Sequence, residues 1–147
     1  MNTTNDHCIS VCNELLRGEM SAVETYDQAI EKYSDLPAAE ELRRIREDHS
    51  RAASRLANNV RSMGGEPETG SGAWGVFATA VQGTANLFGA NSALESLQKG
   101  EEAGRKDYQE ALTDEEVMPA CKELIRDELL PPLIEHIACL EKLEHAA

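Results

Sequence analysis

The chain has 147 residues, 41% of them apolar and only 4% aromatic, and its 27 Asp and Glu against 14 Lys and Arg give a net charge of −13. This length predicts one domain over residues 1–147. The acidic charge disfavours nucleic acid and anionic membrane surfaces as partners, because both would repel it. No signal peptide or membrane-spanning apolar run is visible, so we expect a cytoplasmic protein.

The first half predicts a helical hairpin, in keeping with a composition that favours helices. Apolar residues spaced three and four apart indicate an amphipathic helix over about residues 6–33. A second helix is expected over about 36–63, with Asp35 as its N-cap, Pro37 in its first turn and Gly64-Gly65 at its end.

A long connection follows, over residues 64–91. It begins with the turn-forming sequence GGEPETGSG and continues as AWGVFATAVQGTANLFGAN, which predicts a short crossover helix. Its aromatic residues are Trp74, Phe77 and Phe88. They belong either to the core or, if they are exposed, to an interface.

The last two helices predict a second hairpin. Ser92 with Glu95 forms a capping-box pattern for a helix over about 92–113, and Thr113 with Glu116 marks the start of a helix that runs to about 144. Pro131-Pro132 must bend this last helix or open its hydrogen-bond ladder. The fold class is therefore all-α: a ferritin-like four-helix bundle of two hairpins joined by a long crossover that carries a short extra helix.

One sequence frame occurs twice, as RGEMSAVETYDQAI at residues 17–30 and KGEEAGRKDYQEAL at residues 99–112. In each copy a glutamate, Glu19 or Glu101, occupies an inward position whose neighbours one turn away are mainly apolar. A tyrosine, Tyr26 or Tyr108, lies two turns further along the same face. The repeat indicates a pseudo-twofold relation between the two hairpins.

The second and fourth helices each interrupt their apolar stripe with one histidine, His49 or His136. Each helix thus contributes one ligand-type side chain to the interior. Buried carboxylates need partners, because an isolated buried charge costs several kcal/mol. Three kinds of partner stay open: a metal ion such as iron, manganese or zinc, pairing of Glu with protonated His, and hydrogen bonds from the tyrosines with Arg46 or Arg105 turned inward.

The depth of these residues along the helices can be counted from the turns. Glu19 and His49 are equally far from the turn of the first hairpin, so they should lie level. His136 is displaced from Glu101 by roughly 7 to 12 Å on the same count. Glu128 is the better match in depth and is a possible additional ligand.

Gly18-Glu19 with Tyr26, and Gly100-Glu101 with Tyr108, resemble the repeated frame of rubrerythrin-type proteins in the ferritin-like superfamily, where that Glu binds iron. The chain as a whole is similar to a small bacterial four-helix-bundle family of unknown function, DUF2383. The resemblance implies a metal site of Glu19, His49, Glu101 and His136, with Tyr26, Tyr108 and Arg46 around it and no organic cofactor.

The chain departs from the di-iron pattern of that superfamily. A Glu is expected three residues before each His, but Arg46 and Leu133 stand there. Asp48 and Glu135 directly precede the histidines but point about 100° away, so we do not expect them to substitute. A mononuclear site of two Glu and two His, or a remnant held by ion pairs, fits the residues better.

The cysteines, Cys8, Cys12, Cys121 and Cys139, are interpreted mainly as thiols that pack in the core. A soft-metal or redox site of His7, Cys8 and Cys12 is the alternative, although the spacing matches no CxxC motif.

Two functional hypotheses follow. The first is a metalloprotein with a redox or stress-related role, and the second is a non-catalytic bundle with a degenerate, metal-free core site that acts in self-association or protein interaction. We expect a homo-oligomer, and the sequence names no small-molecule substrate. It contains no phosphate loop, nucleophile elbow or dinucleotide motif that would indicate a kinase, hydrolase or dehydrogenase.

Overall fold

The computed structural model describes residues 3–34, 37–70 and 90–146, and all regular structure in these ranges is helical. The prediction of an all-α protein is confirmed for them. The expected N-cap Asp35, the crossover helix and its aromatic residues Trp74, Phe77 and Phe88 lie outside the described residues.

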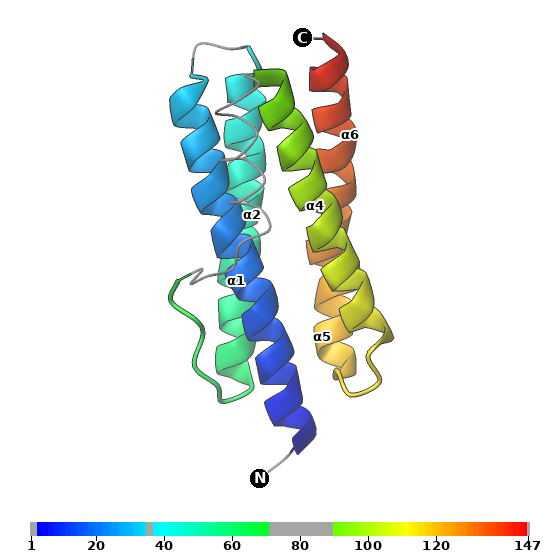
Figure 1. Cartoon of the computed structure of the whole chain (residues 1–147). Coiled ribbons are helices and arrows are strands. Elements are labelled where there is room, and N and C mark those ends of the chain that lie inside the picture. Colours follow the sequence, from blue (N-terminus) through cyan, green and yellow to red (C-terminus); the bar gives the residue numbers. More distant parts are fainter. Residues whose placement is uncertain (1–2, 35–36, 71–89, 147) are drawn as a thin grey trace.

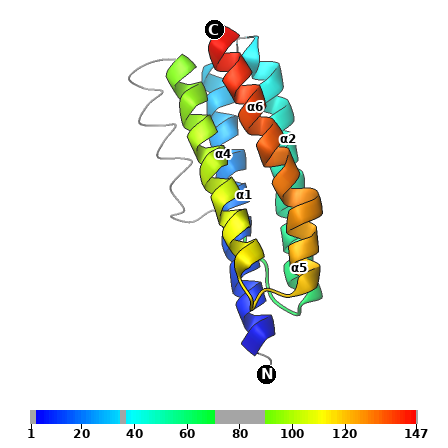
Figure 2. The ribbon, with the colours of Figure 1, turned by 90° about the vertical axis from the view of Figure 1, so that its right-hand side faces the viewer.

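The described helices form four rods. They are α1 (Thr3–Lys32), α2 (Ala38–Ser62), α4 (Ala90–Thr113) and a last rod made of α5 (Pro119–Leu124), the π-helical η1 (Ile125–Leu129) and α6 (Leu130–Ala146). The rods lie side by side in two perpendicular views (Figures 1 and 2), with α1 packed along α2 and α4 packed along the last rod. These are the two predicted hairpins.

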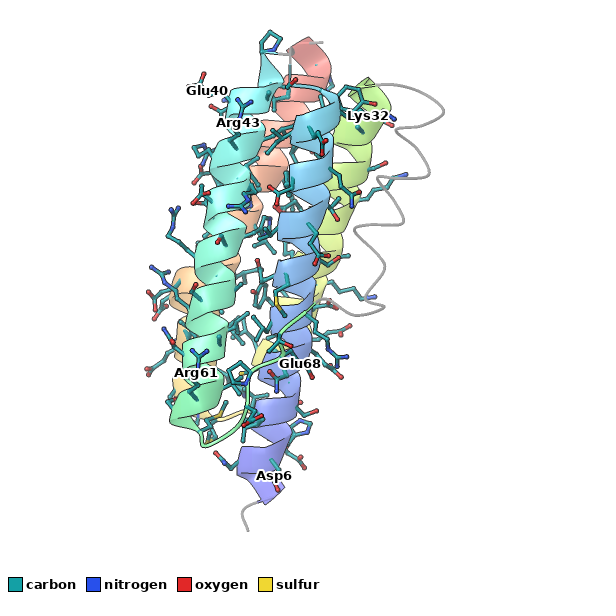
Figure 3. The ribbon with its side chains drawn as sticks, turned by 90° about the vertical axis from the view of Figure 1, so that its left-hand side faces the viewer. Asp6, Lys32, Glu40, Arg43, Arg61 and Glu68 are labelled. Carbon is teal, nitrogen blue, oxygen red and sulfur yellow. The ribbon has the colours of Figure 1, made fainter. Side chains whose placement is uncertain are left out.

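Charged side chains follow the dipole of α2. Glu40 lies in its first turn and Arg61 in its last turn, at opposite ends of the helix in Figure 3. Negative charge near the amino end and positive charge near the carboxyl end each stabilise a helix. The acidic residues of this first turn therefore have a structural explanation.

α2 ends as the sequence predicts, at two glycines. Gly64 has a φ of +84°, and its N–H donates to the Arg61 carbonyl at 2.9 Å, while the Gly65 N–H donates to the Val60 carbonyl at 3.0 Å. These two bonds form a Schellman motif. A Cβ atom on Gly65 would lie 2.7 Å from Cγ2 of Ile9, so any other residue there would force the Ile9 side chain to move.

The last rod begins later than predicted. We expected a start at Thr113 with Glu116, but the helix begins at Pro119. The side chain of Asp114 instead accepts a bond from the Glu116 N–H at 2.9 Å, and the Thr113 hydroxyl donates to the Glu110 carbonyl at 2.9 Å. A proline fits the first turn because its missing N–H would have no helical partner there.

A π turn interrupts the last rod just before Pro131-Pro132, where we expected a bend or an opening of the hydrogen-bond ladder. The Leu130 N–H donates to the Ile125 carbonyl, five residues back. In a regular α-helix, a residue four positions further along lies about 40° further around the helix axis, so a row of residues spaced by four gradually leaves one face. The π turn holds more residues and keeps four such positions in the core: Cys121, Ile125, Leu129 and Leu133.

The interior has two apolar clusters with polar residues between them. One cluster includes Leu16 and Leu56, and the other includes Tyr26 and Leu97. The buried charged or titratable polar residues in the described core are Glu19, His49, Glu101 and His136.

Candidate metal centre

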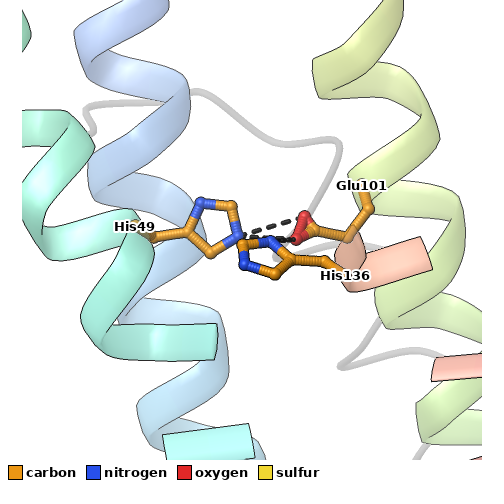
Figure 4. A group of neighbouring side chains, drawn as sticks. All are labelled: His49, Glu101 and His136. Carbon is orange, nitrogen blue, oxygen red and sulfur yellow. Dashed lines mark hydrogen bonds and ion pairs between the residues drawn. The ribbon is translucent and has the colours of Figure 1, made fainter. Parts of the chain in front are cut away.

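The four predicted residues meet in the middle of the bundle, one from each rod. Glu19 comes from α1, His49 from α2, Glu101 from α4 and His136 from α6, and none is more than 5% exposed. Figure 4 shows the rings of His49 and His136 directed toward the Glu101 carboxylate.

Glu101 is the shared partner of both imidazoles. Its Oε1 lies 2.7 Å from Nε2 of His49 and 2.6 Å from Nδ1 of His136. The other nitrogen of each ring also faces a carboxylate: Nδ1 of His49 lies 2.6 Å from Oε2 of Glu19, and Nε2 of His136 lies 2.8 Å from Oδ2 of Asp48. Acid and imidazole groups therefore alternate across the bundle.

Asp48 is the site residue that sequence reasoning missed. It points away from the stripe of α2, as expected, but that direction leads to His136 on α6. Asp48 also pairs with Arg51 and with Arg44, whose Nη1 lies 3.7 Å away. Glu135, the equivalent residue in the second hairpin, pairs with Arg44 at 3.0 Å instead. Asp48 therefore contacts the buried group, whereas Glu135 stays on the surface.

The two tyrosines lie beside the glutamates of the opposite hairpin. The Tyr108 hydroxyl donates to Oε1 of Glu19 at 2.7 Å. Tyr26 stacks on His49 with ring centroids 5.4 Å apart, and burial together with the charge of Glu101 raises its pKa. Each tyrosine thus lies beside the glutamate of the other hairpin, as the pseudo-twofold relation between the two hairpins predicts.

The electrostatics of the group favour a charged imidazole. Burial lowers the pKa of His49, but the charges of Glu101 and Glu19 outweigh burial and raise it well above its ordinary value. Burial likewise raises the pKa of Glu101, yet His49 and His136 reverse that effect and hold it below the ordinary value. Without a metal ion, the group is a buried network of ion pairs.

Two predicted residues lie elsewhere. Nε of Arg46 is 2.9 Å from Asp27, and Nη1 is 2.8 Å from Glu47, so this side chain extends along the edge of the first hairpin. Glu128 pairs with Arg55 at 3.3 Å on the surface of the π segment. Neither reaches the buried group.

The depth count failed for the second hairpin. His136 is level with Glu101 because the loop after α4 extends beyond the end of that helix before α5 begins (Figure 1). The π turn then places extra residues in one turn and reduces the advance along the axis. Glu128, chosen by counting regular helical residues, is therefore misplaced.

Three of the residues fit a metal ion. One ligand atom from each of His49, Glu101 and His136 can be chosen such that all lie within 4.8 Å of one another. Two imidazole nitrogens and a carboxylate suit iron, manganese or zinc. The imidazoles must be neutral to bind, so a metal ion would displace the protons that the ion pairs retain.

Pockets reach the group from two sides. A pocket of about 340 Å³ lies between α1 and α4 and is lined by Glu19, His49 and Glu101. A second pocket of about 190 Å³ lies between α2 and the last rod and is lined by His49, His136 and two arginines, Arg51 and Arg55. Both histidines therefore border space that a small ligand can enter.

A family model described as "Domain of unknown function (DUF2383)" matches residues 7–114. No curated protein and no solved structure matches the chain. The matched range includes Glu19, His49 and Glu101 but ends before His136. Among the described helices, none is both long and apolar enough to cross a membrane.

Proposed function

The chain belongs to the DUF2383 family, and we propose that it is a ferritin-like protein that binds iron, manganese or zinc in its interior. The observation that carries this proposal is the convergence of His49, Glu101 and His136. Three potential ligands from three different rods meet at a buried point, where isolated charges are costly.

The arrangement of helices supports the ferritin-like part of the proposal. Two hairpins joined by a long connection, with carboxylates on the first and third rods and histidines on the second and fourth, are the layout that such proteins use for metal binding.

The contacts divide the site into ligands and residues that orient them. His49 and His136 each direct one nitrogen toward Glu101, and carboxylates of Glu19 and Asp48 hold the opposite nitrogens. A carboxylate behind a metal-bound histidine fixes the ring and increases its basicity. We therefore assign His49, His136 and Glu101 as ligands, and Glu19, which the sequence indicated as a ligand, as a positioning residue alongside Asp48.

Three protein ligands leave coordination positions for water or a small molecule, and the adjoining pockets provide the space. Iron or manganese there would supply redox chemistry, which supports a redox or stress-related role. The side chains of the protein would hold the ion and keep it buried. The imidazole nitrogens of the two histidines would bind or release protons.

One observation favours a second candidate, a metal-free bundle that acts in self-association or protein interaction. Every ring nitrogen of His49 and His136 already has a carboxylate partner within 2.8 Å. A buried network satisfied in this way can persist without an ion and can specify the fold.

Elemental analysis of protein purified without an affinity metal column distinguishes the two candidates. We expect one metal ion per chain in the wild type and in the control Glu102→Gln, whose exposed carboxylate is adjacent in sequence to Glu101. Glu101→Gln should lose the metal, whereas Glu19→Gln should lower metal affinity about ten- to hundredfold. A metal-free, thermally stable wild type that takes up none of the three metals would instead support the second candidate.

A further inference from the structure

A second cluster of potential ligands lies in the apolar core, and it consists of sulfur atoms. Cys8 and Cys12 of α1 and Cys121 of α5 belong to one core cluster, and each is at most 1% exposed. They come from different hairpins. The sequence grouped His7 with Cys8 and Cys12, but the His7 ring pairs with Asp114 at 2.7 Å instead.

The amide of Asn59, on α2, brings two of these sulfurs together. Its Nδ2 lies 3.3 Å from Sγ of Cys12 and 3.2 Å from Sγ of Cys121. One donor nitrogen thus contacts thiols from α1 and α5 at once. The thioether of Met63, at the end of α2, lies 3.9 Å from the Cys121 sulfur. The thiols of the buried Cys12 and Cys121 and the thioether of the partly buried Met63 therefore lie close together and come from three rods.

Cys8 is also held by the backbone that precedes α5. Its sulfur accepts a bond from the Met118 N–H at 3.0 Å, and its S–H donates to the Glu116 carbonyl at 3.3 Å. These bonds tie the start of α1 to the loop that leads into Cys121, and so fix the approach of the two cysteine-bearing helices.

The hydrogen bonds favour a thiolate at one position. Hydrogen bonds from Cys12, Asn59 and Cys8 lower the pKa of Cys121 against the opposing effect of burial. The pKa of Cys12 is raised by its contact with Cys121 and by burial. A thiolate is the form of cysteine that binds metal ions.

We propose that Cys12, Cys121 and Met63 form a binding site for a soft monovalent metal ion, Cu(I), with Asn59 as a positioning residue. Thiolate and thioether sulfurs select such soft ions, whereas the carboxylate and imidazoles of the central site suit harder ones. Cu(I) accepts a low coordination number, which matches the few sulfurs here, while structural zinc requires four nitrogen or sulfur ligands.

The binding step has a simple proton balance and no change of oxidation state. Cu(I) binds both thiolate sulfurs, and each proton that it displaces from Cys12 or Cys121 passes to solvent. The Met63 sulfur and the Asn59 amide lose no proton. Because the ligands join α1, α2 and α5, the bound ion would hold the two hairpins together and stabilise the native state.

The test is Cu(I) transfer to the full, reduced chain from its coloured bathocuproine disulfonate complex without oxygen, followed by absorbance. We expect one Cu(I) per wild-type chain and a rise in Tm on loading. Cys12→Ser and Cys121→Ser should each lower the affinity more than about a hundredfold, beyond the ten- to hundredfold loss expected for Asn59→Ala. Circular dichroism checks that each variant folds. Met63→Leu removes the thioether but keeps the side-chain volume, so we expect it to lower the Cu(I) affinity while the core stays filled.

Two controls separate this site from other thiols and from the central group. Cys139→Ser removes the partly buried cysteine on α6 and should leave Cu(I) affinity unchanged. Conversely, Cys121→Ser should keep the metal content of the central site, so failure of one site is distinguishable from failure of the other. The proposal would be overturned if Cys121→Ser bound Cu(I) as tightly as the wild type. It would also be overturned if Cys139→Ser lost as much Cu(I) affinity as Cys121→Ser, or if Cu(I) lowered the Tm.

Discussion

The two hairpins bring a glutamate and a histidine into contact by different means. In the first, Glu19 and His49 lie 2.6 Å apart on two uninterrupted α-helices. In the second, Glu101 and His136 are also 2.6 Å apart, but a displaced helix start and a π turn are needed to achieve it. A repeated sequence frame thus specifies equivalent side chains without requiring an equivalent backbone.

The outer carboxylates show the same difference. His49 is held by Glu19 from within its own hairpin, whereas His136 is held by Asp48 from the other hairpin. Glu101 connects the two halves because it contacts both histidines. The comparison predicts that the halves respond unequally to substitution and that Glu101 is the residue common to both.

Removing Glu101 should therefore have the largest effect. Glu101→Gln leaves both imidazoles without their shared, fully buried counter-charge, and breaking a buried pair in this way costs about 3 to 5 kcal/mol. Urea unfolding of the metal-free protein measures this loss. The neighbouring Glu102→Gln should change the free energy of unfolding by less than about 0.5 kcal/mol, and an equal effect of both variants would contradict the assignment.

The two histidines should differ when each is replaced alone. His49→Gln leaves both Glu19 and Glu101 without a cationic partner on that side, whereas His136→Gln leaves Glu101 still paired with His49. We expect a loss of about 3 kcal/mol for His49→Gln, at the lower end of the range for Glu101→Gln, and a smaller loss of about 1 to 2 kcal/mol for His136→Gln in the metal-free protein. Thermal and urea unfolding compare them, and a larger loss for His136→Gln would reverse the inferred order.

The pH dependence of stability should distinguish the metal-free and metal-bound forms. The raised pKa of His49 gives a stabilising contribution that is complete below 6.5 and is lost as pH rises through the folded-state value. The lowered pKa of Glu101 gives a contribution present above 4.5 and lost as pH falls through its folded-state value.

For the metal-free protein we therefore expect these contributions to be greatest between pH 4.5 and 6.5. Metal binding requires neutral imidazole, so metal affinity should instead rise with pH above this window. Unfolding curves and metal titrations at matched pH values test both trends. His49→Gln should remove the alkaline decline, and its persistence would show that other groups cause it.

The smallest effect is expected at Arg46. Its pairs with Asp27 and Glu47 are partly exposed, and such surface pairs contribute about 0 to 1 kcal/mol. Arg46→Ala should leave metal content unchanged and lower the free energy of unfolding by no more than this. A loss of metal in that variant would restore the role near the site that the sequence suggested.

Regular helices were the predictable part of this molecule. Periodicity located α1, α2 and α4 within about three residues, and the inward positions of Glu19, His49, Glu101 and His136 follow from the same pattern. These features depend on local spacing, which a sequence displays directly.

The errors have a common physical origin in the arrangement of neighbouring rods. The depth count selected Glu128 because it assumed that the last helix is regular and starts level with the end of the third, and the loop and π turn invalidate that assumption. Asp48 was set aside because the direction of its side chain was known but the location of α6 was not. For Arg46, a place beside Glu19 and a place at the edge of the helix seam were both open, and its pair with Asp27 shows the second.

The π turn also has a consequence for insertions and deletions. The buried positions 121, 125, 129, 133 and 136 are spaced by four, four, four and three, so removing one exposed residue such as Asp127 would give the four–three alternation of a regular α-helix. Pro131-Pro132 oppose that regular helix, because a proline inside one costs about 3 kcal/mol. The additional residue of the π turn and the two prolines thus depend on each other. A deletion in this segment can preserve the core only if the prolines are also replaced.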